Sequence, residues 1–289
     1  MSRPLDLAQP LRRAIADQVV GLFNDPARSE RPVVRRPDGL FGPGSVAWRV
    51  HGDVAAMLVG GVAGLLLQML HPKVLAGVWD HSNFRADMHG RLRRTARFIA
   101  VTTFGGRDEA LAAVERVRRI HEQVAGTLPG GEPYRASDPH LLAWVHVTEA
   151  TSFLSGYVRY VEPRLSLADQ DRYFAEMAEV GARLGVDPLP RTRAEARALI
   201  EAYRPELAAD ARTAEVRERV LTQPPASRTV APLQRAALQA GADLLPPWAR
   251  RMHGLPHAPP GTRVAALALA QTLRWAFEGA RRDKAADSP

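Results

Sequence analysis

Histidine is the side chain through which this chain could most readily bind a metal ion, because its 289 residues include no cysteine. The absence of thiols excludes disulfides, iron–sulfur clusters, Cys-based zinc sites and thiolate-ligated haem. Any metal must therefore be held by His, carboxylate, Tyr, Met or Lys. The nine histidines are His51, His71, His81, His89, His121, His140, His146, His253 and His257.

His121 lies where its helix should carry an apolar core residue. In the helix expected over about residues 108–125, it continues a stripe of apolar residues at helical spacing. An imidazole that faces a core needs a partner. That partner is either a hydrogen-bonding carbonyl or carboxylate, or an iron ion. Arg118 lies one turn earlier, close to the same face, where it could meet an acidic group such as a haem propionate. The other members of the stripe are Leu111, Val114, Val117 and Val124 or Ala125.

His146 shares a helix face with Leu142, Glu149 and Phe153 in the helix expected over about 139–161. His146 and Glu149 could bind a metal together. Helical di-iron sites use Glu-x-x-His, however, and the order here is reversed. We therefore favour a structural hydrogen bond between the two side chains.

A basic run inside an apolar helix is the third candidate. Arg91, Arg94 and Thr95 stand at i, i+3 and i+4 in the helix expected over about 85–104, so we expect them to share one face. A solvated basic face is the usual fate of such a run. The residues that follow, FIAVTTFG, are apolar, however. We therefore expect this face to be partly buried and to need an anion or another acceptor.

The elements that must position these residues are predicted to be helices. Strand-like alternation is nearly absent and helical periodicity runs along the chain, which indicates an all-α fold. Gly105-Gly106 should close a hairpin between the helix with the basic run and the helix with His121, so that the two pack closely. Pro72 should break the chain after a buried helix at 50–70. Further helices are expected at about 8–24, 167–184 and 263–280 and after the capping box Thr192–Glu195, with loops over 25–44, 126–131 and 245–261.

Composition indicates a folded globular protein, with 46% hydrophobic and 24% charged residues. The net charge is +8, but only two of the 39 basic residues are lysine, so we attribute the charge to arginine usage and expect no nucleic-acid partner. The apolar segment 54–70 contains Gln68 and three glycines, which favours a core helix over a membrane span. No signal peptide is visible, so we expect a cytoplasmic location. No dinucleotide, P-loop, nucleophile-elbow or His-Glu-x-x-His motif is present.

An ordered series of motifs resembles a known family over roughly residues 40–270. The series is HP at 71–72, FRADMHGRLRRT at 84–95, FGG at 104–106, VRRIHEQVAG at 117–126 and YRASDPHLLAWVH at 134–146. It is similar to a bacterial family catalogued as a domain of unknown function. That family is related to latex clearing protein (rubber oxygenase) and to the fungal mycophenolic-acid-pathway oxygenase.

The resemblance implies a globin-like helical core that holds one haem b. By this resemblance His121 is the iron ligand, with Arg118 three residues before it. Arg91, Arg94 and Thr95 match the distal face, and we keep His146 among the cofactor-binding candidates. The relatives have lysine where this chain has Arg94, and a guanidinium cannot deprotonate to bind iron as lysine does.

The expected activity is therefore that of a haem-dependent oxygenase or related oxidoreductase, which uses O₂ or peroxide on a small apolar or natural-product substrate. Polyisoprene is disfavoured because residues 68–80 contain no glutamate for the base proposed in rubber oxygenases. Two alternatives stay open: a haem-binding sensor, carrier or peroxidase without a dedicated substrate, and a haem-free helical module that binds a lipid or protein. A homodimer is compatible with the sequence.

We divide the chain into three parts on this basis. Residues 1–38 should form an N-terminal helix and a Pro/Arg-rich arm, and residues 39–260 the haem-binding catalytic domain. Residues 261–289 should form a C-terminal helix, packed on the same domain, and a frayed tail.

Overall fold

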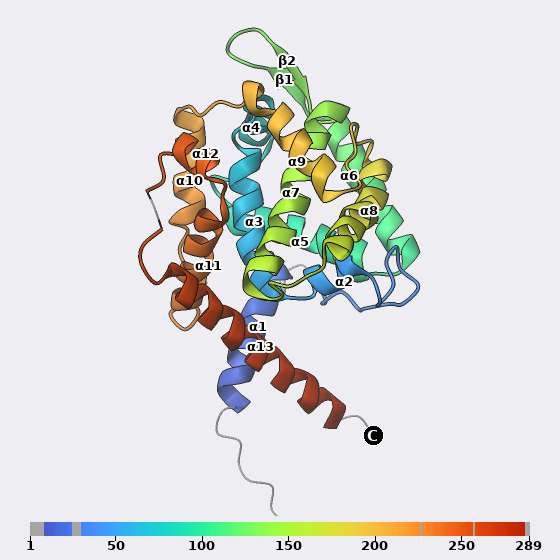
Figure 1. Cartoon of the computed structure of the whole chain (residues 1–289), viewed down its shortest axis with the longest axis vertical. Helices are drawn as coiled ribbons and strands as arrows, with labels where there is room; N and C mark the ends of the chain where they lie inside the picture. The colour runs from blue at the N-terminus through green and yellow to red at the C-terminus, as the bar shows by residue number, and fades with distance from the viewer. Residues whose placement is uncertain (1–8, 25–29, 226, 257, 287–289) are drawn as a thin grey trace, which may run out of the picture.

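The computed structural model describes residues 9–24, 30–225, 227–256 and 258–286, and in this part it confirms the all-α fold (Figure 1). The strands found there, β1 (Ala125–Thr127) and β2 (Pro133–Arg135), form a small antiparallel hairpin. A 3₁₀ turn covers Arg204–Glu206. The helices are α1 (Gln9–Phe23), α2 (Val46–His51), α3 (Val54–Gln68), α4 (Pro72–His81), α5 (Met88–Phe104), α6 (Arg107–Glu122), α7 (Pro139–Tyr160), α8 (Leu167–Leu184), α9 (Arg193–Ala202), α10 (Ala211–Leu221), α11 (Ala231–Leu244), α12 (Pro247–Met252) and α13 (Thr262–Ala286).

Two helices, α3 and α7, cross in near-backbone contact at the centre of the molecule (Figure 1). Small residues on both helices permit this approach. A Cβ atom on Gly60 of α3 would lie 2.8 Å from the Phe153 Cα and from the Ser152 carbonyl oxygen of α7. A Cβ on Gly156 of α7 would lie 2.9 Å from the Ala56 carbonyl oxygen of α3. The glycines of the apolar segment 54–70 therefore serve helix packing, as expected of a core helix.

The expected helix at 50–70 is two helices, α2 and α3, because local capping interrupts it. Asp53 has an extended backbone, and its side chain accepts a hydrogen bond from the Ala56 N–H, so it begins α3 as an N-cap. At the other end the predicted break is confirmed. His71 caps α4, Pro72 occupies its first position, and α4 is bent by 105° from α3.

The predicted hairpin of two helices is confirmed as α5 and α6, which pack together on either side of Gly105-Gly106. The loop expected over 126–131 is partly wrong, because its flanks pair as β1 and β2. Tyr134 explains this pairing. Its ring is buried and its hydroxyl donates to the Asp80 carboxylate at 2.7 Å, which ties β2 to α4.

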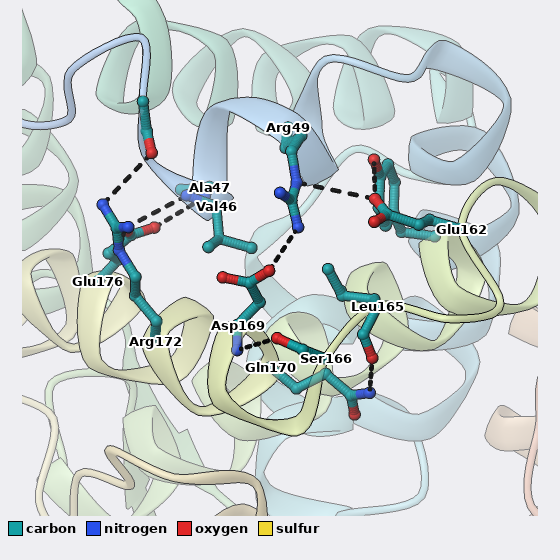
Figure 2. Close-up of polar contacts among 12 residues, drawn as sticks. Val46, Ala47, Arg49, Glu162, Leu165, Ser166, Asp169, Gln170, Arg172 and Glu176 are labelled. Atoms are coloured by element: carbon teal, nitrogen blue, oxygen red, sulfur yellow. Dashed lines mark hydrogen bonds and ion pairs between the residues drawn. The ribbon is translucent and has the colours of Figure 1, made fainter.

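Charged side chains hold α2 against α8 (Figure 2). The Glu176 carboxylate accepts hydrogen bonds from the Val46 and Ala47 backbone N–H groups at 3.2 and 2.8 Å. These donors belong to the first turn of α2 and have no partner within that helix. Arg49 of α2 forms ion pairs with Asp169 at 3.0 Å and Glu162 at 3.7 Å. The register of α2 on α8 is thereby fixed.

The outer face of α3 is covered by α1, α11 and α13, which share a buried apolar cluster with it. This cluster includes Ile15, Val19, Ala237 and Leu269. Helix α13 continues to Ala286, through residues where we expected a frayed tail, and residues 287–289 lie outside the described part. Residues 1–8 and 25–29 of the expected N-terminal segment also lie outside it.

Within the described ranges, no single helix is long and apolar enough to cross a membrane. The bent pair α3–α4 meets the length and composition requirement when its two helices are taken together.

Candidate functional site

A cavity of about 350 Å³ lies beside α3, within the size range of small-molecule sites. Helices α1, α5, α7, α11 and α13 also line it, together with His51 at the end of α2 and residues between helices such as Arg35 and Gln223. The wall is mostly apolar. Its residues include Met57, Leu65, Leu92, Ile99, Leu238 and Leu273.

Glu149 contributes the one carboxyl group among the described residues that line this cavity. It forms no hydrogen bond or ion pair within the described ranges. Its position follows from the close crossing of α3 and α7, because the Glu149 Cα would lie 3.6 Å from a Cβ atom on Gly64. Burial raises the pKa of Glu149 to about 7, so at neutral pH both protonation states are populated. A carboxyl group in this state can give or take a proton.

His51 lies in the wall but has no free ring nitrogen. Its Nδ1 is 2.7 Å from the Thr103 hydroxyl and its Nε2 is 2.9 Å from the Tyr173 hydroxyl. Burial lowers the pKa of His51 to about 3, which keeps the ring neutral. His51 therefore joins α2, α5 and α8 rather than offering a ligand to the cavity.

The basic run on α5 is divided between the cavity and solvent. Arg91 and Thr95 line the cavity. The Arg91 guanidinium donates to the Ser82 hydroxyl at 2.9 Å, and its burial, together with the nearby Arg94 charge, lowers the pKa of Arg91 to about 10. Thr95 is also exposed, which places it where the cavity meets solvent.

Arg94 does not share the buried face that we expected for all three residues. Its side chain is 52% exposed and lies 3.6 Å from the Asp87 carboxylate. The reason is helical geometry. At about 100° per residue, Thr95 lies about 40° from Arg91 on one side and Arg94 about 60° from it on the other. The prediction of a shared buried face is therefore wrong: Arg94 is directed towards solvent, and Thr95, although it lines the cavity, is exposed as well.

His121 occupies the inward stripe of α6, as predicted. Ala110 and Val114 on this stripe are buried and His121 is half-buried. Burial lowers the pKa of His121, and its ring has no hydrogen bond or ion pair within the described ranges. A neutral imidazole with unused nitrogens is what a metal site requires. His121 is not, however, among the residues that line the cavity beside α3.

Arg118 is directed away from this stripe. It is exposed and forms ion pairs within its own helix, with Glu115 at 3.2 Å and Glu122 at 3.9 Å. The expectation that it lies close to the face of His121 is wrong, because the i−3 and i+4 glutamates of the same helix hold it on the solvent side.

His146 is buried on the α8 side of α7, where a Cβ on Gly181 would lie 3.1 Å from its ring. Burial lowers the pKa of His146 to about 4. The favoured hydrogen bond between His146 and Glu149 is wrong: the two side chains form no such bond, and Glu149 lines the cavity whereas His146 packs against Gly181 of α8.

A second cluster, which the sequence analysis did not predict, joins the start of α4, the start of α7 and the 3₁₀ turn. The ring nitrogens of His71 and His140 lie 3.3 and 2.9 Å from the Glu206 carboxylate. Two histidines and one carboxylate can bind a divalent metal. The Nδ1 of His71 accepts the Lys73 backbone N–H, however, so its Nε2 carries the proton that metal binding would remove. The cluster is therefore better suited to tying three segments together.

Comparison with known proteins assigns the family. No curated protein and no solved structure is significantly similar to the chain. Residues 48–275 match the family described as ER-bound oxygenase mpaB/B′/rubber oxygenase, catalytic domain. The match begins within α2 and ends within α13, so it spans every helix of the cavity wall except α1. The chain therefore belongs to the family of oxygenase catalytic domains that includes mpaB and rubber oxygenase.

Proposed function

We propose that this protein is a haem b-dependent oxygenase that acts on a small apolar or natural-product substrate with O₂ or peroxide. The observation that carries this proposal is the apolar cavity beside α3, which lies within the part of the chain that matches an oxygenase catalytic domain. Its wall combines apolar side chains with a smaller number of polar groups, which include Arg91, Thr95 and Glu149, and this is the composition of a small-molecule site.

The residues present fit a haem through His121. Its half-buried imidazole is neutral and forms no hydrogen bond or ion pair within the described ranges, so a ring nitrogen is free to bind a ligand. Haem, when bound, would supply the redox chemistry with O₂ or peroxide. His121 would hold the iron, with His146 as the alternative ligand, and Arg91 is the buried cation on the neighbouring helix α5.

The protein's own contribution is to bind and orient the substrate and to exclude water. The apolar wall removes the substrate from solvent, and Thr95 stands at the mouth through which a substrate would enter. The resemblance gave a distal role to Arg91, Arg94 and Thr95. In this proposal only Arg91 and Thr95 keep that role, because Arg94 is directed towards Asp87 and solvent.

The test is the absorbance spectrum of the purified protein and of one variant. The wild type should show a Soret band that shifts with dithionite and CO, and His121→Ala should lose this band while its helical circular dichroism is largely kept. His81→Ala, at an exposed position on α4, is the matched control and should keep the band. Loss of the band in His146→Ala instead would move the ligand to α7, and a wild type that takes up no haem contradicts the proposal.

Oxygen consumption then separates an oxygenase from a haem carrier. Small apolar candidate substrates should accelerate O₂ uptake by the haem-loaded protein. A haem-loaded protein that shows no substrate-dependent uptake with any candidate would favour a carrier or sensor.

A further inference from the structure

Glu149 is a carboxyl group in an apolar wall with no protein partner. It stands on α7 where that helix crosses α3, close to Gly64, and opens into the cavity that Phe153 and Leu65 also line. It has no hydrogen bond, ion pair or ring contact within the described ranges. Buried polar groups in folded proteins nearly always have a partner, so a partnerless carboxyl in a cavity wall indicates that the partner comes from the ligand.

Packing alone gives no reason for a glutamate at this position. The faces of α3 and α7 that meet here are otherwise built from small and apolar residues, such as Ala56, Gly60 and Phe153. An apolar side chain of similar size would fill this wall without the cost of desolvating a carboxyl group. The glutamate therefore has a role that an apolar residue cannot perform.

We propose that Glu149 is the polar anchor of the cavity and that it binds the hydroxyl or protonated amino group of an otherwise apolar molecule. Both groups share the property that the site requires, which is a hydrogen-bond donor for a carboxyl oxygen. The surrounding apolar wall takes the rest of the molecule. Calling this molecule the substrate rests on the proposed function, but its binding does not depend on haem chemistry.

The carboxylate group of a ligand would not bind beside Glu149. Glu149 becomes negatively charged as the pH rises through its pKa of about 7, and two carboxylates repel each other. The guanidiniums of the cavity wall belong to Arg35 and to Arg91 of α5, so any binding of a carboxylate would come from these residues and not from Glu149. Whether the cavity prefers a ligand with a hydrogen-bond donor or one with an acid group therefore tests the role of Glu149.

Three probes of equal chain length test this preference: 1-decanol, decylamine and decanoic acid. Their binding to the full chain, purified with whatever haem it holds, is measured at pH 8 by isothermal titration calorimetry. The alcohol and the amine should bind about tenfold or more tightly than the acid. Amine binding should also weaken about tenfold from pH 8 to pH 6, because Glu149 takes up a proton over this range.

Two substitutions separate charge from shape. Glu149→Leu should weaken alcohol and amine binding about tenfold or more and leave acid binding unchanged or improved. Glu149→Gln keeps a hydrogen-bonding group, so it should keep alcohol binding within about threefold while it loses the preference for the amine and the pH dependence. Glu179→Gln, at an exposed position on α8, is the control and should bind all three probes as the wild type does. Circular dichroism confirms that each variant is folded.

The outcomes distinguish this proposal from the proposed function. Equal affinity for the three probes, tightest binding of the acid, or unchanged alcohol and amine binding in Glu149→Leu would overturn the role of Glu149 and leave the oxygenase proposal intact. A protein that takes up no haem, but binds the alcohol and amine through Glu149, would overturn the oxygenase proposal and leave the anchor standing.

Discussion

The protonation state of Glu149 affects the stability of the fold. Burial raises its pKa from 4.5 to about 7, so the folded protein holds this proton more tightly than the unfolded chain does. Folding therefore carries no penalty from Glu149 below pH 4.5. A penalty grows as the pH rises through 4.5 to 7 and is complete above pH 7.

Replacing Glu149 with Gln should remove this penalty. We expect the free energy of unfolding of Glu149→Gln to exceed that of the wild type by about 1–3 kcal/mol at pH 8 and to equal it within error at pH 4.5. Denaturant titration at the two pH values measures the difference, with Glu179→Gln as the exposed control. A gain that is the same at both pH values would show that Glu149 is not titrating in a buried environment.

Sequence alone could place some of the site residues on a helix face but could not find their neighbours. The apolar spacing in α6 correctly predicts that His121 faces inward, because helical periodicity is a local property. The same reasoning fails for Arg94 and Arg118, whose neighbours Asp87, Glu115 and Glu122 hold them towards solvent. The sequence does not predict that Glu149 lines a cavity, because the residues of α3 that surround it lie far away along the chain.

Most of the long helices and their caps could be predicted from the sequence, and most of the short elements could not. The bounds of α5, α7 and α8 and the capping box of α9 agree with the sequence patterns. The 14-residue α11 was not predicted, and neither were the shorter α4, α10 and α12 and the β1–β2 hairpin. Such short segments are too weak to form alone and depend on contacts that sequence patterns do not show.

The close crossing of α3 and α7 positions Glu149 in the cavity wall, and Gly60 is one of the glycines on which it depends. A Cβ on Gly60 would lie 2.8 Å from the backbone of α7, whereas a Cβ on Gly61 would lie 3.7 Å from the Phe153 ring, an ordinary contact. We expect Gly60→Ala to lower the free energy of unfolding by about 1–3 kcal/mol, because the two helices must separate.

Gly61→Ala is the matched control, one residue away on the same helix. It should leave stability unchanged or raise it by up to about 1 kcal/mol, since alanine is the better helix former. Thermal unfolding of both variants measures the difference. Equal stabilities for the two would mean that α3 and α7 are not in backbone contact.

At the scale of the whole molecule, the cavity depends on segments that are distant in sequence. Val19 of α1 and Leu273 of α13 line it together with residues of α3, α5, α7 and α11. The sequence predicts that α13 packs on the domain formed by residues 39–260, but it gives no indication that α13 lines a cavity. The family match extends to residue 275 and so includes the part of α13 that does this.

A single arginine joins α13 to the central helices. Arg274 Nε donates to the Asp53 carboxylate at 2.9 Å and its Nη2 donates to the Tyr160 carbonyl at 3.1 Å. Asp53 also caps α3 through its other oxygen, and its side chain is 10% exposed. The middle of α13 is therefore bound to the start of α3 and the end of α7, which places Leu269 and Leu273 over the cavity.

Arg274→Met should keep the volume of the side chain but lose both interactions. Because it leaves the nearly buried Asp53 carboxylate without its charged partner, we expect the free energy of unfolding to fall by about 1.5–3 kcal/mol. The loosened α13 should also exchange its amide hydrogens faster and bind 1-decanol more weakly. Arg263→Met, at an exposed position near the start of the same helix, should change stability by less than about 0.5 kcal/mol. If Arg274→Met loses stability while amide exchange in α13 and decanol binding stay at wild-type values, then α13 is fixed by its apolar contacts alone and Arg274 does not hold the cavity closed.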